Sequence, residues 1–388
     1  MKTTEHYVIH FLQKFDAYPF VVRMQGRDYL IGNGNPGFRV IIHDDISKKG
    51  LLASTSLALG EAYMHGNIEI EGDLYQALNQ ILGQIGKFSK NVFAMRKLLM
   101  TSASRSNQKK EVTFHYDIGN QFYKMWLDET LSYSCGYFLS EQDTLFQAQQ
   151  NKIDYILKKL YLREGMTLLD IGCGWGSLLI EAVKKYKVQG VGITLSLEQY
   201  KAFRARCKKE NLEDKITVKL MDYRELADSG MQFDRVVSVG MLEHVGRKHY
   251  EMFMQNVDSV LKPKGICLLH FISALRESPG DPWIKKYIFP GGVIPSLREI
   301  LAICGEMGFY TLNVESLRRH YNRTLLCWAG NFHKQQEKVK EMFDGEFVRM
   351  WDLYLCSCAA AFHNGIIDLH QLLLSKGVNN NLPMTKWF

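Results

Sequence analysis

Short apolar runs and longer amphipathic segments alternate through the middle of the chain. The apolar runs predict strands at residues 167–171, 190–194, 216–220, 235–239 and 266–271. The segments between them have apolar residues at helical spacing and predict helices near 177–186, 196–211 and 248–260. Alternation of this kind indicates an α/β fold, in which a parallel sheet is covered by helices on both faces.

Further elements are predicted on either side of these strands. Ser140 and Asp143 have the spacing of a capping box, which predicts a helix that runs through Leu160. Two late runs, at residues 309–316 and 323–330, are interpreted as strands. The run at 167–171 is almost entirely apolar, as expected for a strand that is buried on both faces.

The first 73 residues have a different pattern. Strand-like runs at 20–24, 28–32 and 38–43 are separated by turn sequences such as GNGNPG, which predicts a small α+β unit. Apolar residues at helical spacing then begin at Leu74. We expect an N-terminal domain over 1–100, a polar linker over 101–111 and a second domain over 112–388.

The segment from Leu74 to Lys110 is strongly basic. It contains no Asp or Glu and seven basic residues, which are Lys87, Lys90, Arg96, Lys97, Arg105, Lys109 and Lys110. Such a segment predicts an anionic partner, either nucleic acid or a lipid surface. Apolar residues interleave with the cations, so the segment can lie on an anionic membrane; a helix with a basic face in solvent is the alternative.

Composition narrows the class of protein. The chain has 388 residues, of which 46% are hydrophobic and 23% charged, as is typical of a globular protein. The longest uncharged run, residues 353–367, includes Ser, His and Asn, so no transmembrane helix is expected. The N-terminus has no apolar signal-peptide core, which predicts a cytoplasmic protein. None of the eight cysteines form a CxxC pair, so we expect buried thiols and no metal site.

The sequence LLDIGCGWG at 168–176 is the most informative motif. An apolar strand ends at Asp170, and Gly172, Gly174 and Gly176 then lead into a helix. Glycines allow a sharp turn and a close approach of the backbone to a ligand, which favours a nucleoside-type cofactor. The spacing is not that of the dinucleotide motif GxGxxG, and a turn that serves only packing is the alternative.

Polar residues follow the neighbouring strands. The second strand has no acid at its tip and offers Thr194 and Gln199, whereas Tyr223 after the third strand has a ring that suits an adenine face. Glu243 and His244 follow the fourth strand, and His270 lies near the end of the fifth. With strand order 3-2-1-4-5, these ends border one crevice, although surface or structural roles are the alternative for each residue.

Several motifs in order carry a resemblance to a known family. They are HYDIGNQFYKMWLD (115–128), LSYSCGYF (131–138), LLDIGCGWG, VSVGMLEHVG (237–246), DPWIKKYIFPGG (281–292) and YNRTLLCW (321–328). The chain resembles the cyclopropane-fatty-acyl-phospholipid synthases over 110–388 and is similar to the mycolic acid cyclopropane synthases. The resemblance implies a class I methyltransferase with a doubly wound seven-stranded sheet, preceded by a small α+β domain.

The activity implied is methyl transfer from S-adenosylmethionine to a cis double bond of an unsaturated phospholipid acyl chain, followed by ring closure with loss of a proton. A dry pocket with aromatic walls would tolerate the carbocation, and the chain offers Tyr133, Tyr137, Phe138, Phe271 and Tyr287. The resemblance also implies a bound bicarbonate as the base. Its cradle would be Cys135, Glu243, His270, the backbone of Ile272 and Tyr321.

Other family positions carry over in the same way. The cofactor site would comprise Tyr133, Ser134, Asp170, Gly172, Cys173, Gly174, Gly176, Thr194, Leu195, Ser196, Gln199, Tyr223 and Arg224. Cys358 matches a cysteine that has been assigned to the active site in this family, but small residues around it fit tight helix packing equally well.

The resemblance further implies a homodimer that associates peripherally with the inner face of the membrane. A branched methyl product, an inactive lipid-binding relative, a small-molecule methyltransferase and a nucleic-acid binder are the alternatives. The last has no recognition motif, and we expect no nucleic-acid partner.

Overall fold

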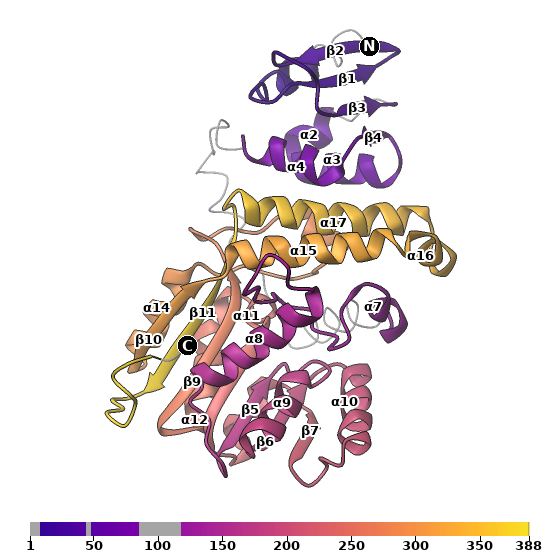
Figure 1. Ribbon diagram of the computed structural model, residues 1–388. Coiled ribbons are helices and arrows are strands. Elements are labelled where there is room, and N and C mark those ends of the chain that lie inside the picture. The colour runs from indigo at the N-terminus through magenta and orange to yellow at the C-terminus, as the bar shows by residue number, and fades with distance from the viewer. Residues whose placement is uncertain (1–7, 44–47, 85–117, 387) are drawn as a thin grey trace. The chain divides into compact units, whose positions relative to one another are not determined.

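The computed structural model describes residues 8–43, 48–84, 118–386 and 388, which form two compact units (Figure 1). The N-terminal unit contains 8–43 and 48–84 together with 280–290 and 325–366. The sheet unit contains 118–279, 291–324, 367–386 and 388. Two segments that we expected in a single domain over 112–388 therefore group with the N-terminal residues. The expected linker and the basic residues from Lys87 to Lys110 lie outside the described residues.

The sheet unit is built on seven strands, in the order β10-β11-β9-β8-β5-β6-β7. Their bounds are β5 (Thr167–Ile171), β6 (Gln189–Thr194), β7 (Ile216–Leu220), β8 (Phe233–Val239), β9 (Leu261–Ser273), β10 (Phe309–Ser316) and β11 (Asp368–Lys376). Strands β5 to β9 are parallel, and β11 is antiparallel to β9 and β10. The order 3-2-1-4-5 predicted for the first five strands is confirmed, as is the seven-stranded methyltransferase sheet.

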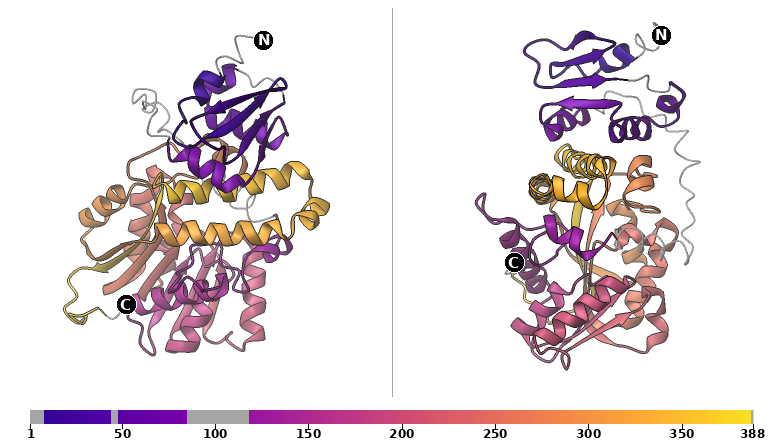
Figure 2. Two further views of the ribbon diagram at one scale, coloured as in Figure 1. Left: turned by 45° about the horizontal axis from the view of Figure 1, so that its top comes forward. Right: turned by 90° about the vertical axis from the view of Figure 1, so that its right-hand side faces the viewer.

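Helices cover both faces of this sheet (Figure 2). One face carries α8 (Leu145–Lys159), α9 (Ser177–Tyr186) and α10 (Leu197–Lys209), and the other carries α11 (Leu242–Val245), α12 (Tyr250–Val260) and α14 (Leu297–Glu306). Successive residues of a strand face opposite sides of the sheet. Leu168 therefore packs in the core on the side of α8, α9 and α10, and Leu169 packs in the core on the side of α11, α12 and α14. A short helix, α7 (Asn120–Trp126), precedes this region.

One predicted strand and one predicted capping box are wrong, whereas the helix expected to run through Leu160 is confirmed as α8. The strand expected at 323–330 lies within helix α15 (Arg318–His333), where Leu325, Trp328, Ala329 and Phe332 are buried at helical spacing. A short apolar run is compatible with a strand or with a helix. The strand that completes the seven-stranded sheet is β11, which was not predicted. The capping box of α8 is formed by Thr144 and Gln147, whereas Ser140 and Asp143 close a turn just before it.

The N-terminal unit has a four-stranded sheet in the order β2-β1-β3-β4. The predicted strands are confirmed as β1 (Phe20–Met24), β2 (Arg27–Ile31) and β3 (Arg39–Ile42), followed by β4 (Ile68–Glu71). Its helices are α2 (Lys48–Ala53), α3 (Thr55–Met64), α4 (Leu74–Leu82), α13 (Pro282–Tyr287), α16 (Gln336–Met342) and α17 (Gly345–His363).

The late helices are bound to the early ones within this unit. Arg349 of α17 donates hydrogen bonds to the carbonyl oxygens of Tyr63 and Ile68. Trp283 of α13 lies so close to Gly60 that a Cβ there would be 2.3 Å from the indole ring. In the described part of the chain, no helix is both long enough and apolar enough to cross a bilayer.

Candidate active site

The glycine loop after β5 forms a turn that only glycine adopts without strain. Gly172 and Gly176 have φ values of 83° and 86°. A Cβ on Gly176 would lie 2.0 Å from the ring of Phe203, so this glycine also allows the loop to pack on α10. The N–H groups of Gly172 and Cys173 donate to the carbonyl oxygen of Ile193, which joins the loop to β6.

A cavity opens above this loop at the carboxyl ends of β5, β6 and β8. Every residue predicted to hold the cofactor lines it, apart from Ser196 and Arg224. The lining residues from that prediction are Tyr133, Ser134, Asp170, Gly172, Cys173, Gly174, Gly176, Thr194, Leu195, Gln199 and Tyr223. Lys152, Met241 and His244 complete parts of the wall. The structure thus brings together cavity residues that lie up to 114 positions apart in the chain, from Thr130 to His244.

The two predicted residues that do not line the cavity support those that do. Ser196 caps α10 by accepting from the N–H of Gln199. Arg224 pairs with Asp222, with its Nε 2.9 Å from Oδ1, and lies over the ring of Tyr223. The Tyr223 ring is buried against Phe253, and its hydroxyl finds no hydrogen-bond partner in the described parts of the chain.

Asp170 and Lys152 place two buried charges in the cavity wall. Burial raises the pKa of Asp170 to about 7, although Lys152 opposes the rise. Burial also lowers the pKa of Lys152 to about 8. Lys152 Nζ donates to Ser134 Oγ over 3.0 Å, whereas Asp170 Oδ1 has no hydrogen-bond partner among residues 8–43, 48–84 and 118–386. A buried carboxylate oxygen of this kind calls for a donor or cation from a ligand.

Glu243 and His270 lie near the ends of β8 and β9, next to this cavity. Glu243 Oε1 accepts from the Ile272 N–H over 2.6 Å, and the N–H of Gly240, which lines the cavity, donates to the His270 carbonyl over 2.8 Å. The Ile272 donor that we expected to serve an anion thus serves Glu243 in this structure. Burial raises the pKa of Glu243 to about 7, although part of the residue's surface remains exposed.

Each of these two side chains has one polar atom without a partner. Glu243 Oε2 and His270 Nε2 are buried, and neither makes a hydrogen bond within the described residues. Burial is the main cause that lowers the pKa of His270 well below its usual range, with Lys152 and Lys159 contributing. A neutral imidazole and a carboxyl group that each leave one buried atom unsatisfied fit a small polar ligand held between donors and acceptors.

Cys135 and Tyr321 are both tied to Leu317. The Cys135 thiol lies 3.9 Å from the Leu317 carbonyl oxygen, to which the Tyr321 N–H donates over 3.0 Å. The Leu317 N–H donates in turn to Leu369, whose partner across the sheet is Ile272. Burial raises the pKa of Cys135 far above its usual range, so this cysteine is a thiol and not a nucleophile.

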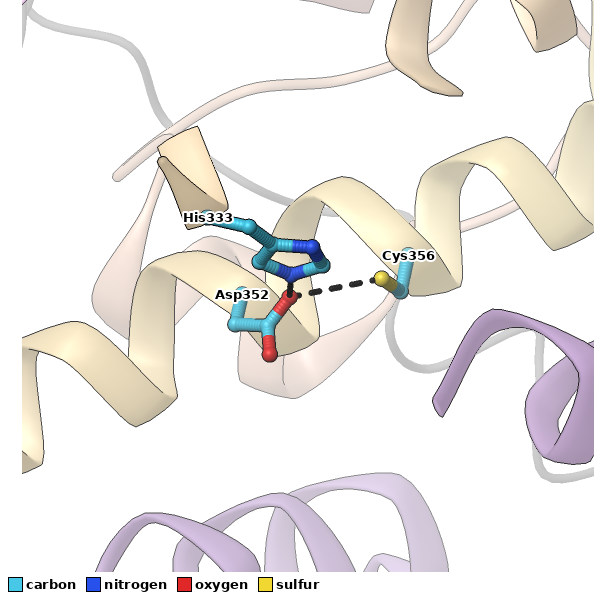
Figure 3. A group of neighbouring side chains, drawn as sticks. All are labelled: His333, Asp352 and Cys356. Atoms are coloured by element: carbon cyan, nitrogen blue, oxygen red, sulfur yellow. Dashed lines mark hydrogen bonds and ion pairs between the residues drawn. The ribbon is translucent and has the colours of Figure 1, made fainter. Parts of the chain in front are cut away.

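Cys358 does not line the cavity, and it belongs to the N-terminal unit. Burial raises its pKa to about 12, which is the property of a packing thiol. Six residues earlier in the same helix, Asp352 binds His333 Nε2 over 2.6 Å and Cys356 Sγ over 3.4 Å (Figure 3). Because the carboxylate satisfies both neighbours, this cluster is explained by hydrogen bonds alone.

The aromatic residues expected around the substrate do not all line one cavity. Tyr133 lines the cavity and contacts Tyr123 and Trp126. Phe271 is wholly buried in the core on the side of α12, because it alternates with His270 along β9. Tyr287 lies in the N-terminal unit, where its hydroxyl donates to Glu61.

Comparison with known proteins identifies the family. Residues 103–372 match the profile described as Mycolic acid cyclopropane synthetase, and residues 8–92 match a domain of unknown function. The chain belongs to the mycolic acid cyclopropane synthetase family. The first match covers well over half of the chain and includes the glycine loop, Glu243 and His270.

Curated members of this family align over most of the chain. It is 40% identical to the cyclopropane-fatty-acyl-phospholipid synthase of Escherichia coli strain K12, over 87% of this chain and 88% of the relative. It is 38% identical to a probable fatty acid methyltransferase of Pseudomonas putida, over 84% and 85%.

Solved structures of family members match the fold. The cyclopropane synthase MmaA2 from Mycobacterium tuberculosis superposes with a TM-score of 0.66 at 34% identity, over 69% of this chain and 98% of that one. The mycolic acid cyclopropane synthase CmaA1, complexed with SAH and CTAB, gives a TM-score of 0.65 with the same identity and coverage.

Sequence reasoning missed two groups of polar residues in this site. Gln149 and Lys152 lie on the buried face of α8 beside Ile153 and Ile156, and a cation on an apolar stripe was a readable signal. Gln371 was missed because its strand was not predicted. His244 was noticed but given no role; it lines the cavity, and burial lowers its pKa to about 4.

Proposed function

We propose that this family member uses S-adenosylmethionine to convert a cis double bond of a phospholipid acyl chain into a cyclopropane ring. The observation that carries the proposal is the pair of buried, unsatisfied atoms Glu243 Oε2 and His270 Nε2 next to the glycine-loop cavity. Methyl transfer to a double bond leaves a carbocation, and closing the ring must then remove a proton, so the reaction needs a base at this position.

Different residues of the cavity would bind different parts of the methyl donor. The glycine loop lets the backbone approach the ligand, and Tyr223 offers a buried ring for the adenine. Asp170 offers an acceptor for a cationic or amino group, and Ser134 is held in place by Lys152. Bound there, S-adenosylmethionine supplies an electrophilic methyl group. The CmaA1 structure, with its bound SAH, supports this assignment.

The cradle has the composition of an oxyanion site that can also take a proton. Glu243 has a pKa of about 7, so its carboxyl group holds or releases a proton near neutrality. His270 is neutral because it is buried, and Cys135 and Tyr321 would close the site through their shared contact with Leu317. These residues would hold bicarbonate, which supplies a base while burial keeps water out.

The product distinguishes the proposal from its neighbours in the family. Purified protein is incubated with S-adenosylmethionine and vesicles of cis-unsaturated phospholipid. The acyl chains are then released, and their masses are measured by mass spectrometry. Chains heavier by one CH₂ with upfield cyclopropane protons in the NMR spectrum support the proposal. The same mass gain without those protons indicates a methylene or methyl-branched chain that keeps one double bond, because a saturated methyl branch would need a reductant and would add CH₄. No mass gain would leave an inactive lipid-binding relative.

The membrane association of the enzyme rests on sequence alone. The seven basic residues from Lys87 to Lys110 support docking of the protein on anionic headgroups, each contributing about 1 kcal/mol near the surface. We infer a peripheral protein on the cytoplasmic face of the membrane. Co-sedimentation with anionic vesicles should weaken as salt rises, and binding that does not depend on salt contradicts docking of this kind.

The family resemblance also supports a homodimer. Light scattering of the purified protein at several concentrations should give twice the chain mass of 44.8 kDa, and a constant mass of one chain excludes the dimer.

A further inference from the structure

A line of buried hydrogen bonds leads from helix α8 to the imidazole of His270. Lys159 Nζ binds the Glu315 carboxylate, which also accepts from the Tyr155 hydroxyl over 2.7 Å. The same ammonium lies 2.8 Å from Gln371 Oε1, and Gln371 Nε2 lies 3.2 Å from His270 Nδ1. Lys159, Gln371 and His270 are all at most 1% exposed, so water does not compete for these contacts.

The chemistry of the donors fixes the direction of each bond. An ammonium group has only donors, so the Gln371 atom next to Lys159 must be the amide oxygen. The amide nitrogen therefore faces His270, and an amide nitrogen is itself only a donor. His270 Nδ1 must then accept, which it can do only when it carries no proton. The single proton of a neutral imidazole is left on Nε2.

We propose that Gln371 and Lys159 are positioning residues that lock His270 into the tautomer with its proton on Nε2. Because Nε2 is the buried atom without a partner among the described residues, its N–H is directed at the proposed oxyanion. His270 then serves as a hydrogen-bond donor and not as the base. In this arrangement His270 does not accept the proton that ring closure releases.

The electrostatic surroundings agree with this assignment. Lys152 and Lys159 both oppose a charge on His270, and burial opposes it more strongly still, so the pKa of His270 lies well below its usual range. An imidazolium would also place an N–H at Nδ1 against the donor of Gln371. The proton lost in ring closure must therefore go to the oxyanion or to Glu243. This part of the argument rests on the proposed function, whereas the tautomer does not.

The tautomer can be read directly from the wild-type protein. In protein labelled with ¹⁵N-histidine, long-range proton–nitrogen correlation distinguishes a protonated Nδ1 from a protonated Nε2. The His270 signal is assigned by its loss in His270→Gln. We expect a neutral ring with the proton on Nε2. A proton on Nδ1 overturns the proposal, whether or not the protein makes cyclopropane lipids.

Two variants separate positioning from general damage. In Gln371→Glu, a carboxylate replaces the amide, and Nδ1 should become protonated in the same spectrum. Tyr155→Phe is the matched control, because it removes a group at the far end of the line and leaves Lys159 bound to Gln371. Its His270 signal should match the wild type. An unchanged His270 signal in Gln371→Glu contradicts the proposal.

Activity provides an independent measure. Gln371→Leu should raise the bicarbonate concentration for half-maximal turnover by roughly 10-fold or more, with KM for S-adenosylmethionine within about twofold. Damage to the fold would change both constants and contradict a specific positioning role. If no lipid product forms in any variant while the wild-type ring carries its proton on Nε2, the proposed function fails and the tautomer assignment stands.

Discussion

The carboxyl edge of the main sheet contains two regions that treat their buried polar groups in opposite ways. At the end of β6, the Thr194 hydroxyl donates to Gln199 Oε1 and accepts from the Ser196 N–H, and Ser196 Oγ accepts from Gln199. At the ends of β8 and β9, Glu243 and His270 each leave one buried atom unsatisfied within the described residues. The first region forms part of the cavity wall, and we propose that the second binds a small anion.

This difference separates residues that shape the donor cavity from residues that we propose bind an anion. A buried polar group that stays unsatisfied costs about 1–3 kcal/mol, and a ligand that completes it removes that cost. The β6 region should therefore respond to mutation through donor affinity and stability. The cradle at β8 and β9 should respond through turnover and anion binding.

The largest expected effect is from Glu243→Gln. The amide keeps the shape and loses the acidic group, so product formation should fall by roughly 10²–10⁴-fold. The affinity for S-adenosylhomocysteine should stay within about threefold, because Glu243 does not line the donor cavity. Turnover by product mass and titration calorimetry give the two numbers. Glu299→Gln, in an ion pair with Arg247, is the control and should leave turnover near the wild-type rate.

Gly176→Ala should be the most damaging change on the donor side. A side chain there adopts a φ of 86° and clashes with Phe203, so we expect a loss of about 3 kcal/mol or more in the free energy of unfolding. Urea denaturation measures it. Gly174→Ala is the matched control, because its φ is 55° but a Cβ meets nothing within 4 Å. Equal losses in the two variants would contradict the packing argument.

The raised pKa of Glu243 predicts a pH dependence of stability. Because the folded pKa is about 7 against 4.5 for the free side chain, the folded protein binds more protons between these values. The stability of the wild type should thus fall relative to Glu243→Gln as pH rises from about 4.5 to 7, by about 3 kcal/mol in all, and should level off above pH 7. Urea unfolding of both proteins from pH 5 to 8 tests this. A difference that does not change with pH would show that the carboxyl group is not buried.

The smallest effect should come from Thr194→Val. It keeps the shape of the β6 wall but removes one hydroxyl that both donates and accepts, at a cost of about 1–2 kcal/mol in stability. Binding of S-adenosylhomocysteine should weaken several-fold, and turnover at saturating donor should be unchanged. A large loss of turnover at saturating donor would show that Thr194 takes part in the reaction, and it would contradict the division between the β6 wall and the ends of β8 and β9.

The regular part of the fold was predictable because local patterns agreed with the tertiary structure. The strand–helix alternation located β5 to β9, and the strand order put Glu243 and His270 near the ends of neighbouring strands. The C-terminal part was not, since the run at 323–330 is apolar enough for a strand but spaces its buried residues as a helix. Without β11 between β9 and β10, Gln371 had no place near His270.

Only those residues of the candidate site that belong to sequence motifs could be predicted. The glycine loop, Tyr223 and Glu243 follow strands, so their positions follow from the order of the sheet. Lys152 and Lys159 approach the site from α8, and packing across the sheet face, which the chain order does not specify, decides what they contact. The positive charge of the segment from Lys87 to Lys110 can be read from the sequence, but charge alone does not distinguish binding to a lipid surface from exposure to solvent.

The central claim is that Glu243 and His270 form an oxyanion site next to the donor cavity. The most direct test is titration of bicarbonate into protein saturated with S-adenosylhomocysteine, followed by calorimetry or ¹³C NMR. The account predicts saturable binding to the wild type that weakens at least roughly 10-fold in Glu243→Gln and is unchanged in Thr194→Val. No binding to the wild type, or equal binding to Glu243→Gln, would contradict it.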